Sequence, residues 1–181
     1  LAFYYFVNGY GKVEIMKKLN IAIVIVSDSR TLGTDKSGKL LKKLIEDDGH
    51  KIIERVIVPD NIYEIRSIVS QFIVNKKIDV IISSGGTGIT GSDGTPEAIK
   101  VILDKEIEGF GELFRMISYE QIKTSSLQTR CLAGVSNSTF IFVLPGSVHA
   151  CKTAWEEIIS HQLNSDTKPC NLVMLMPRLK E

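Results

Sequence analysis

A glycine-rich turn with an acid behind it is the part of this sequence best suited to chemistry. Residues 79–98 read DVIISSGGTGITGSDGTPEA, which places Gly85, Gly86, Thr87 and Gly88 directly after an apolar run. Backbone amides and hydroxyls in such a turn can bind an anion such as phosphate. Asp93 follows shortly afterwards, and a carboxylate at that position can hold a divalent cation beside the anion. The stretch therefore indicates a phosphate and metal site.

Two common nucleotide-binding motifs fit this turn poorly. Residues 86–91 match G-x-G-x-x-G, but a dinucleotide-binding fingerprint follows the first strand and has an acid roughly 20 residues later. Here the motif follows the third apolar run. A Walker loop needs a lysine after its last glycine, and none is present. A tight turn with positive φ is the structural alternative, but four glycines among residues 85–91 exceed what one turn needs.

The elements around this turn predict an α/β fold. Runs rich in Ile and Val at residues 21–26, 52–58, 80–83 and 139–144 are typical of strands covered on both faces, as in a parallel sheet. Apolar positions at helical spacing lie at 40–45, 62–73 and 148–159, and further helices are expected at 109–120 and after a cap at 124–126. This order predicts one doubly wound domain with a mostly parallel sheet flanked by helices.

Polar residues follow each predicted strand. Because parallel strands end at one edge of a sheet, where ligands bind, we expect these residues to converge. Asp60 and Asp93 could together hold Mg²⁺ through hard oxygen ligands, although each one singly could instead cap a turn or helix. The expected substrate and phosphate ligands at these exits are Ser27, Asp28, Ser84, Gly85, Gly86, Thr87, Gly88, Pro145, Gly146 and Ser147, together with Thr95 at the helix start that follows the glycine turn.

Composition excludes several other classes of protein. The 181 residues carry a formal net charge of +1, which gives no support to a nucleic-acid or membrane-surface role. Three cysteines without a CxxC motif favour a reducing cytoplasm over a disulfide framework. Cys131 and Cys170 have no base near them in the sequence, which argues against thiol catalysis. Residues 1–15 are expected to be an extension outside a domain spanning 16–181; the alternative is an arm that packs on a neighbouring subunit.

The motifs resemble those of the MoaB/MogA family of molybdenum cofactor biosynthesis proteins. The resemblance covers residues 19–179, and two segments, 150–156 and 168–171, look specifically like the MoaB branch. The ordered set of similar motifs comprises Ile81–Gly88 with Asp93, Thr95–Ala98, Glu108–Glu112, Ser125, Arg130, Ala133-Gly134 and Leu144–Ser147.

This resemblance implies a doubly wound domain that assembles as a trimer, or as a hexamer in the MoaB branch. It implies transfer of AMP from Mg-ATP to the terminal phosphate of molybdopterin, with other enzymes of the same pathway as partners. Asp60 and Asp93 match the family's two important acids, expected to hold Mg²⁺ and to orient the phosphates. Gly85–Gly88 match its phosphate-binding turn, while Ser27, Asp28, Ser125 and Pro145–Ser147 match segments that line the pterin and nucleotide pocket.

One departure from the family pattern affects the charge of the site. The family often has Arg-Asp-Val-Thr-Pro where this chain has Ser92-Asp93-Gly94-Thr95-Pro96. A basic side chain that could contact phosphate is therefore missing. The departure keeps open a second function, a non-catalytic molybdopterin-binding or carrier protein of the same pathway.

Overall fold

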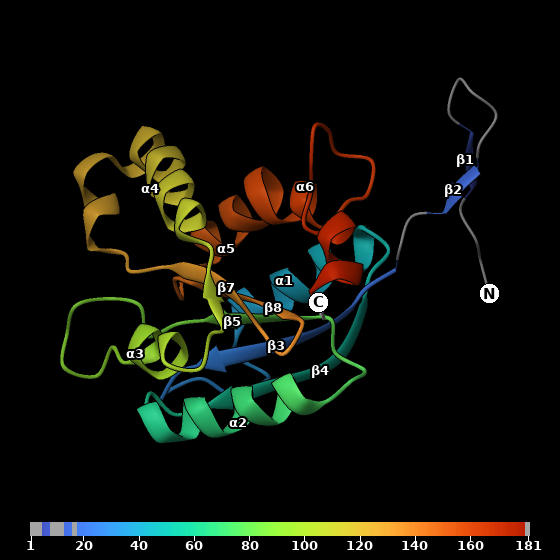
Figure 1. The fold of residues 1–181 in the computed structure, drawn as a ribbon. Coiled ribbons are helices and arrows are strands. Elements are labelled where there is room, and N and C mark those ends of the chain that lie inside the picture. The colour runs from blue at the N-terminus through green and yellow to red at the C-terminus, as the bar shows by residue number, and fades with distance from the viewer. Residues whose placement is uncertain (1–4, 8–12, 16–17, 180–181) are drawn as a thin grey trace.

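The central feature of the molecule is a six-stranded sheet in the order β4-β3-β5-β8-β7-β6 (Figure 1). The computed structural model of the chain describes residues 5–7, 13–15 and 18–179. Four neighbouring strands are parallel: β4 (Lys51–Val58), β3 (Asn20–Val26), β5 (Val80–Ser84) and β8 (Thr139–Leu144). Strand β7 (Leu132–Ser136) runs antiparallel to β8, and β6 (Lys105–Glu106) antiparallel to β7. The predicted α/β class and the four predicted strands are confirmed.

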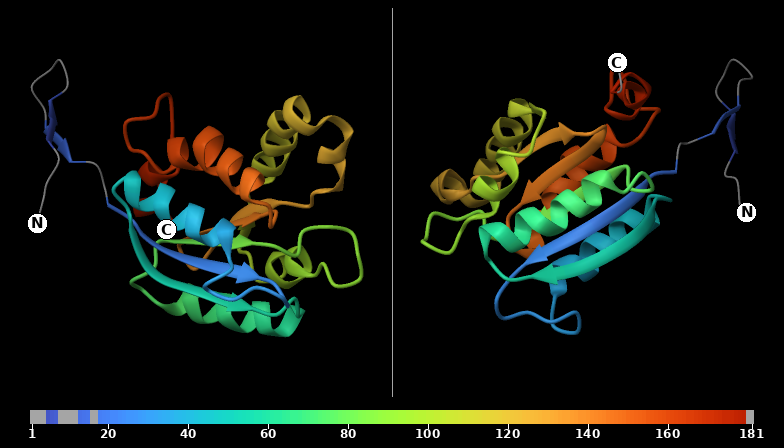
Figure 2. Two further views of the ribbon diagram at one scale, coloured as in Figure 1. Left: turned by 180° about the vertical axis from the view of Figure 1, so that it is seen from behind. Right: turned by 60° about the horizontal axis from the view of Figure 1, so that its bottom comes forward.

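Helices cover both faces of this sheet, as the two views of Figure 2 show. One face packs on α2 (Ile62–Val74) and α3 (Thr95–Lys100). The other packs on α1 (Lys36–Asp47), α4 (Glu108–Ile122) and α5 (Val148–Ala154). The last of these continues through the π-helix η2 (Trp155–Ile159) into α6 (Ser160–Gln162), and the 3-10 helix η3 (Val173–Arg178) closes the same layer.

The sheet is buried on both sides because its strands carry apolar residues at nearly every position. Alternate side chains of a strand point to opposite faces, so Ile21, Ile23 and Ile25 of β3 join the cluster on the α1 side. Ala22, Val24 and Val26 join the cluster on the α2 side. Nearly continuous apolar strands are the expected signature of a sheet covered twice, and here they leave only loops and helix ends to form a site.

The segment 105–137 differs in part from expectation. The predicted helix is present as α4, but the expected cap at residues 124–126 is wrong, because the 3-10 helix η1 (Lys123–Gln128) has Ile122 at its N-cap and no side-chain cap. Strands β6 and β7 were not predicted. The first has two residues and the second reads LAGVS, too short and too poor in β-branched residues to give a clear strand pattern.

The N-terminal part of the chain forms its own strand pair. Strands β1 (Tyr5–Val7) and β2 (Val13–Ile15) are antiparallel to each other in a separate two-stranded sheet. Residues 1–4, 8–12 and 16–17 lie outside the described part, so the domain boundary at residue 15 stays a prediction. Within the described residues, no helix is both long and apolar enough to cross a membrane.

Candidate phosphate and metal site

The carboxyl ends of the parallel strands come together at one edge of the sheet. Ser27 N, just after β3, donates to Val58 O at the end of β4, at 2.9 Å, and Gly85 N, just after β5, donates to Leu144 O at the end of β8, at 3.0 Å. A Cβ built on Gly146 would lie only 3.3 Å from Gly85 Cα. The predicted convergence of the four strand exits is therefore present, and it places the glycine turn beside the loops that follow β3, β4 and β8.

Gly85 and Gly86 turn the chain sharply out of β5. Their φ angles are +115° and +63°, a region that residues with a Cβ rarely adopt. A Cβ on Gly85 would overlap Val26 O, and one on Gly86 would overlap Thr95 Oγ1. Among the hydrogen bonds of the described residues, the amides of Gly86 and Thr87 donate none. Two unpaired N–H groups at a tight turn are the arrangement expected of a phosphate cradle.

Asp60 lies directly against this turn. A Cβ on Gly86 would be 2.8 and 2.9 Å from the two carboxylate oxygens of Asp60, and Asp60 Oδ1 accepts from Gly94 N at 3.3 Å. Partial burial raises the pKa of Asp60 above its ordinary value, the Gly94 hydrogen bond opposes this, and the charges of Asp93 and Asp28 add to it. The alternative that Asp60 caps α2 is wrong, because Asn61 is the N-cap and accepts from Tyr63 N at 2.9 Å.

Asp93 closes the far end of the same loop. It accepts from Thr90 N at 2.9 Å and from the Thr90 hydroxyl. The hydroxyl bond is the main reason that the pKa of Asp93 lies below its ordinary value, with the Thr90 and Gly88 amides and the Arg130 charge contributing against slight desolvation. Asp93 therefore stabilises its own turn, as the capping alternative anticipated. Its charge still contributes to the raised pKa of Asp60, and the two carboxylates lie against neighbouring glycines of the turn, Asp60 against Gly86 and Asp93 against Gly88.

Arg130 holds this loop in shape, a role that the sequence did not reveal. Its Nε donates to Gly88 O at 2.7 Å, its Nη2 to Asp93 O at 2.6 Å, and its Nη1 pairs with Glu97. Its backbone N also donates to Thr87 O at 3.0 Å. All three guanidinium nitrogens are occupied by protein groups, so Arg130 acts as a clamp on the loop.

The remaining predicted ligands divide into residues at the edge and residues behind it. Ser84 is fully buried, and its hydroxyl donates to Pro145 O at 3.1 Å, so it joins two strand exits instead of facing a ligand. The Ser147 hydroxyl caps α5 by accepting from Ala150 N at 3.1 Å. Asp28 Oδ1 accepts from Asp60 N at 3.0 Å and so positions that acid. Ser125 is exposed in η1, on the segment that leads to Arg130.

The donor set suits a magnesium ion that keeps phosphate and water ligands. Asp60 and Asp93 supply carboxylates, and the hydroxyl oxygen of Thr95 is fully buried without a hydrogen-bond partner while it lies beside Gly86. No cluster of three or more His, Cys, Asp or Glu that could hold a metal was found in the described part of the chain. One or two carboxylates plus substrate phosphates is the usual way that proteins bind Mg²⁺, so these residues fit it.

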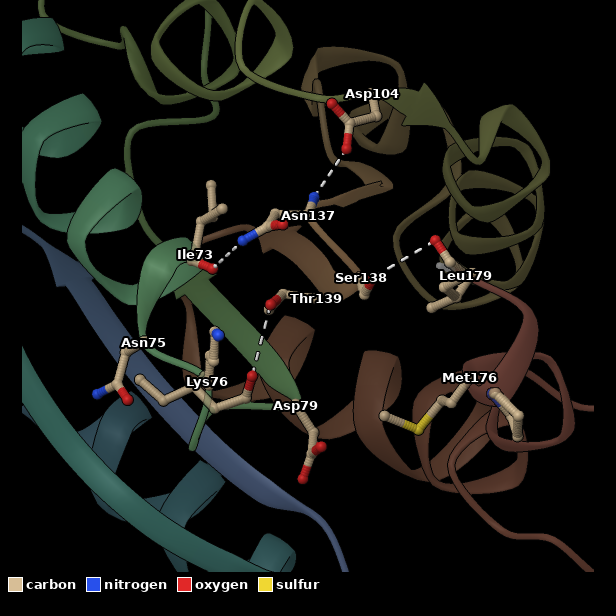
Figure 3. Close-up of a pocket in the computed structure, with 12 residues that line it drawn as sticks. Ile73, Asn75, Lys76, Asp79, Asp104, Asn137, Ser138, Thr139, Met176 and Leu179 are labelled. Atoms are coloured by element: carbon tan, nitrogen blue, oxygen red, sulfur yellow. Dashed lines mark hydrogen bonds between the residues drawn. The ribbon is translucent and has the colours of Figure 1, made fainter. Parts of the chain in front are cut away.

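Two further clefts lie outside this site. A cleft of about 770 Å³ lies at the opposite edge of the sheet, where β5 and β8 begin (Figure 3). Its polar groups largely satisfy one another: Asn137 N donates to Asp104 Oδ2 at 2.7 Å and Asn137 Nδ2 to Ile73 O at 3.1 Å. A second cleft, of about 520 Å³, borders the clamp through Pro96 and Arg130.

The opposite pKa shifts of the two acids give opposite effects on stability. Because the folded-state pKa of Asp60 is raised, wild type loses stability relative to Asp60→Asn as pH rises from about 4 through that raised value. We expect Asp60→Asn to raise Tm at pH 7 by about 2 °C or less. Because the pKa of Asp93 is lowered, Asp93→Asn lowers Tm at pH 7, and this deficit fades as pH falls through its folded pKa. Scanning fluorimetry from about pH 2 to pH 8, a range that extends below the ordinary pKa of aspartate, measures both differences; equal signs at pH 7 would contradict the assignment.

The fold and this edge define an α/β protein with a glycine-rich turn at the carboxyl edge of its sheet, and comparison with known proteins identifies the family. Residues 22–165 match the MoCF_biosynth family, described as "Probable molybdopterin binding domain". Molybdenum cofactor biosynthesis protein B of Escherichia coli K12 is 47% identical over 161 residues, or 89% of this chain and 93% of that protein. The corresponding protein of Bacillus cereus is 42% identical, covering 86% of this chain and 93% of that protein.

Solved structures agree with these sequence matches. A crystal structure of a molybdenum cofactor biosynthesis protein B has a TM-score of 0.82 at 39% identity, covering 91% of this chain and 97% of that one. A tungsten cofactor synthesizing MoaB from Pyrococcus furiosus has a TM-score of 0.74 at 33% identity, covering 91% and 99%. The chain belongs to the MoaB/MogA family of molybdenum cofactor biosynthesis proteins. This membership supports a role in that pathway.

Proposed function

We propose that this protein transfers AMP from Mg-ATP to molybdopterin, giving adenylylated molybdopterin and pyrophosphate. The observation that carries the proposal is the carboxylate of Asp60 packed against Gly86, beside the unpaired amides of Gly86 and Thr87. Anion donors and a metal-type ligand within one turn are what phosphoryl chemistry needs. Membership of the family supplies the pterin substrate as the expected partner of this turn.

The reaction needs no nucleophilic side chain. An oxygen of the pterin's terminal phosphate attacks the α-phosphorus of ATP. The bond between that phosphorus and the oxygen that bridges the α- and β-phosphates breaks, and pyrophosphate leaves. The two buried thiols fit this scheme, because burial raises the pKa of Cys131 and of Cys151 to about 11 and keeps both protonated. Catalysis then rests on positioning and charge stabilisation.

Each part of the site has a defined task in this reaction. The Gly86 and Thr87 amides bind phosphate oxygens, and the Arg130 clamp keeps the loop closed around them. Asp60, Asp93 and the Thr95 hydroxyl would hold Mg²⁺. Bound there, Mg²⁺ would offset negative charge on the reacting phosphates. Asp28 accepts a hydrogen bond from the Asp60 backbone amide and so fixes the main chain at the residue whose carboxylate lies against the glycine turn.

A direct assay tests the proposal. Purified protein incubated with ATP, Mg²⁺ and molybdopterin is expected to form adenylylated molybdopterin and an equal amount of pyrophosphate, detected by chromatography and mass spectrometry. Reactions without Mg²⁺ and without molybdopterin are the controls. Tight molybdopterin binding without product would instead support the carrier function, which the engagement of Asp93 in its own turn favours.

We also propose that the protein works as a homo-oligomer, a trimer or a hexamer. Helix α4 exposes an apolar row at three-residue spacing, which neighbouring copies of the chain would cover. The row consists of Leu113, Met116, Tyr119 and Ile122, between 38% and 64% exposed.

A further inference from the structure

Arg30 carries a guanidinium group that the site described above does not use. It lies in the loop after β3, where the Ser27 hydroxyl accepts from the amides of Ser29 and Arg30, each at 3.3 Å. These two bonds hold the loop in a compact turn at the carboxyl edge of the sheet. Arg30 is therefore placed by the backbone at the same edge as the glycine turn.

One nitrogen of the Arg30 guanidinium is anchored from two sides. Its Nη1 donates to Gly146 O at 3.1 Å and to Ser37 Oγ at 2.8 Å. The same nitrogen lies 3.8 Å from Asp35 Oδ1, and the Ser37 hydroxyl donates to that oxygen at 3.0 Å. Asp35 is completely buried, so the anchor belongs to the rigid interior. Arg30 loses little further conformational freedom if it binds a ligand.

The opposite edge of the guanidinium is free. Nε and Nη2 of Arg30 donate to no acceptor among the described residues, in contrast to Arg130, whose three nitrogens are all engaged. The Nε–Nη2 edge is planar and presents parallel N–H groups, which match two oxygens of a phosphate or carboxylate. The anchored nitrogen thus leaves a bidentate edge available.

The charges around Arg30 also favour binding of an anion. Asp35 pairs with Arg55 as well, at 3.2 Å, so the cluster holds two cations and one buried carboxylate, a balance of 2 − 1 = +1. Asp35 lies closer to Arg55, at 3.2 Å, than to Arg30, at 3.8 Å, and the Arg30 side chain is 35% exposed against 15% for Arg55. Arg30 is therefore the less compensated and more accessible of the two cations. Asp28 does not neutralise it, because no Asp28–Arg30 ion pair occurs among the described residues and Asp28 accepts from Asp60 N.

We propose that Arg30 binds a phosphate group of the substrate through Nε and Nη2. Its anchor, Gly146, lies against Gly85 at the start of the glycine turn, and the loop at Ser92 lacks the basic residue that would otherwise meet a phosphate. The inference rests on the proposed function. The phosphate can come from ATP or from the pterin, and separate binding measurements distinguish these sources.

Calorimetric titrations with ATP plus Mg²⁺ and, separately, with molybdopterin test the inference. Arg30→Gln is expected to weaken binding of one of the two ligands about 10- to 100-fold, the loss typical of a charged hydrogen-bonded contact. Arg30→Lys keeps the charge but not the fork, so it is expected to recover only part of that affinity. Arg55→Gln removes the other partner of Asp35; it should lower Tm while leaving both Kd values within about twofold of wild type.

The outcomes separate this inference from the proposed function. Unchanged Kd values for both ligands in folded Arg30→Lys and Arg30→Gln would overturn the role of Arg30, even if wild type forms the adenylylated product. An equal loss in Arg55→Gln would overturn it too, since the effect would then come from the Asp35 cluster. If binding is weaker in the Arg30 variants alone and wild type forms no product, the phosphate-binding role of Arg30 stands and the proposal of adenylyl transfer is overturned. Wild type that binds neither ligand overturns both.

Discussion

Replacing Asp60 with asparagine is expected to slow adenylyl transfer at least about 100-fold, which corresponds to about 2.7 kcal/mol of barrier. Asparagine keeps the shape of the side chain and can still accept the hydrogen bond from Gly94 N, which Asp60 Oδ1 accepts at 3.3 Å. It removes only the negative charge that would hold Mg²⁺ beside Gly86. The expected loss is therefore in turnover, while the folded protein remains as stable as wild type or slightly more so.

Steady-state pyrophosphate release measures this effect, with the exposed residue Asp47 as the matched control. Asp47 lies on α1 and pairs with Lys43, so Asp47→Asn removes an aspartate charge without touching the site and should leave kcat unchanged. Asp93→Asn is expected to lose at least about 100-fold as well, with a loss of stability that Asp60→Asn does not show. Near-normal rates in both site variants would mean that the two acids serve only the loop.

The convergence of the strand ends followed from the sequence because a parallel sheet fixes where strands end. Continuous apolar runs marked β3, β4, β5 and β8, and the residues just after them had to meet at one edge. The contacts of Asp60 with Gly86 and of Asp28 with Asp60 agree with that reasoning. Residue identity was less informative for the serines. Ser84 and Ser147 lie at strand exits, but the Ser84 hydroxyl donates to Pro145 O and the Ser147 hydroxyl caps α5.

The roles of Arg130 and Arg30 could not be predicted from the sequence. Arg130 is distant in the chain from Gly88 and Asp93, yet it binds both carbonyl oxygens, and no local pattern marks a partner that arrives from another element. Arg30 follows Ser27 and Asp28 closely in the sequence, but whether it can bind a ligand depends on which of its nitrogens already donate to protein groups. That depends on Asp35, Ser37 and Gly146, which only the folded chain brings together.

Replacing Gly86 with alanine is expected to remove activity and to destabilise the fold by about 2–4 kcal/mol. The residue has φ +63°, and an added Cβ would overlap Thr95 Oγ1 and lie 2.8 Å from Asp60 Oδ2. The turn must therefore open, which separates Asp60 from the unpaired amides. At about 2–4 °C per kcal/mol for a chain of this size, Tm falls by roughly 4–16 °C, and kcat/KM falls at least about 100-fold.

Gly91 provides the matched control for Gly86 within the same loop. An added Cβ there meets no atom within 4 Å, and its φ is not among the positive values. Gly91→Ala is expected to change stability by less than about 0.5 kcal/mol and to keep the wild-type rate. Thermal unfolding and pyrophosphate release on both variants compare the two positions. If Gly86→Ala matched Gly91→Ala in both measurements, the close approach of Asp60 to Gly86 would not be required for activity. A loop that tolerates a methyl group at position 86 does not depend on that contact.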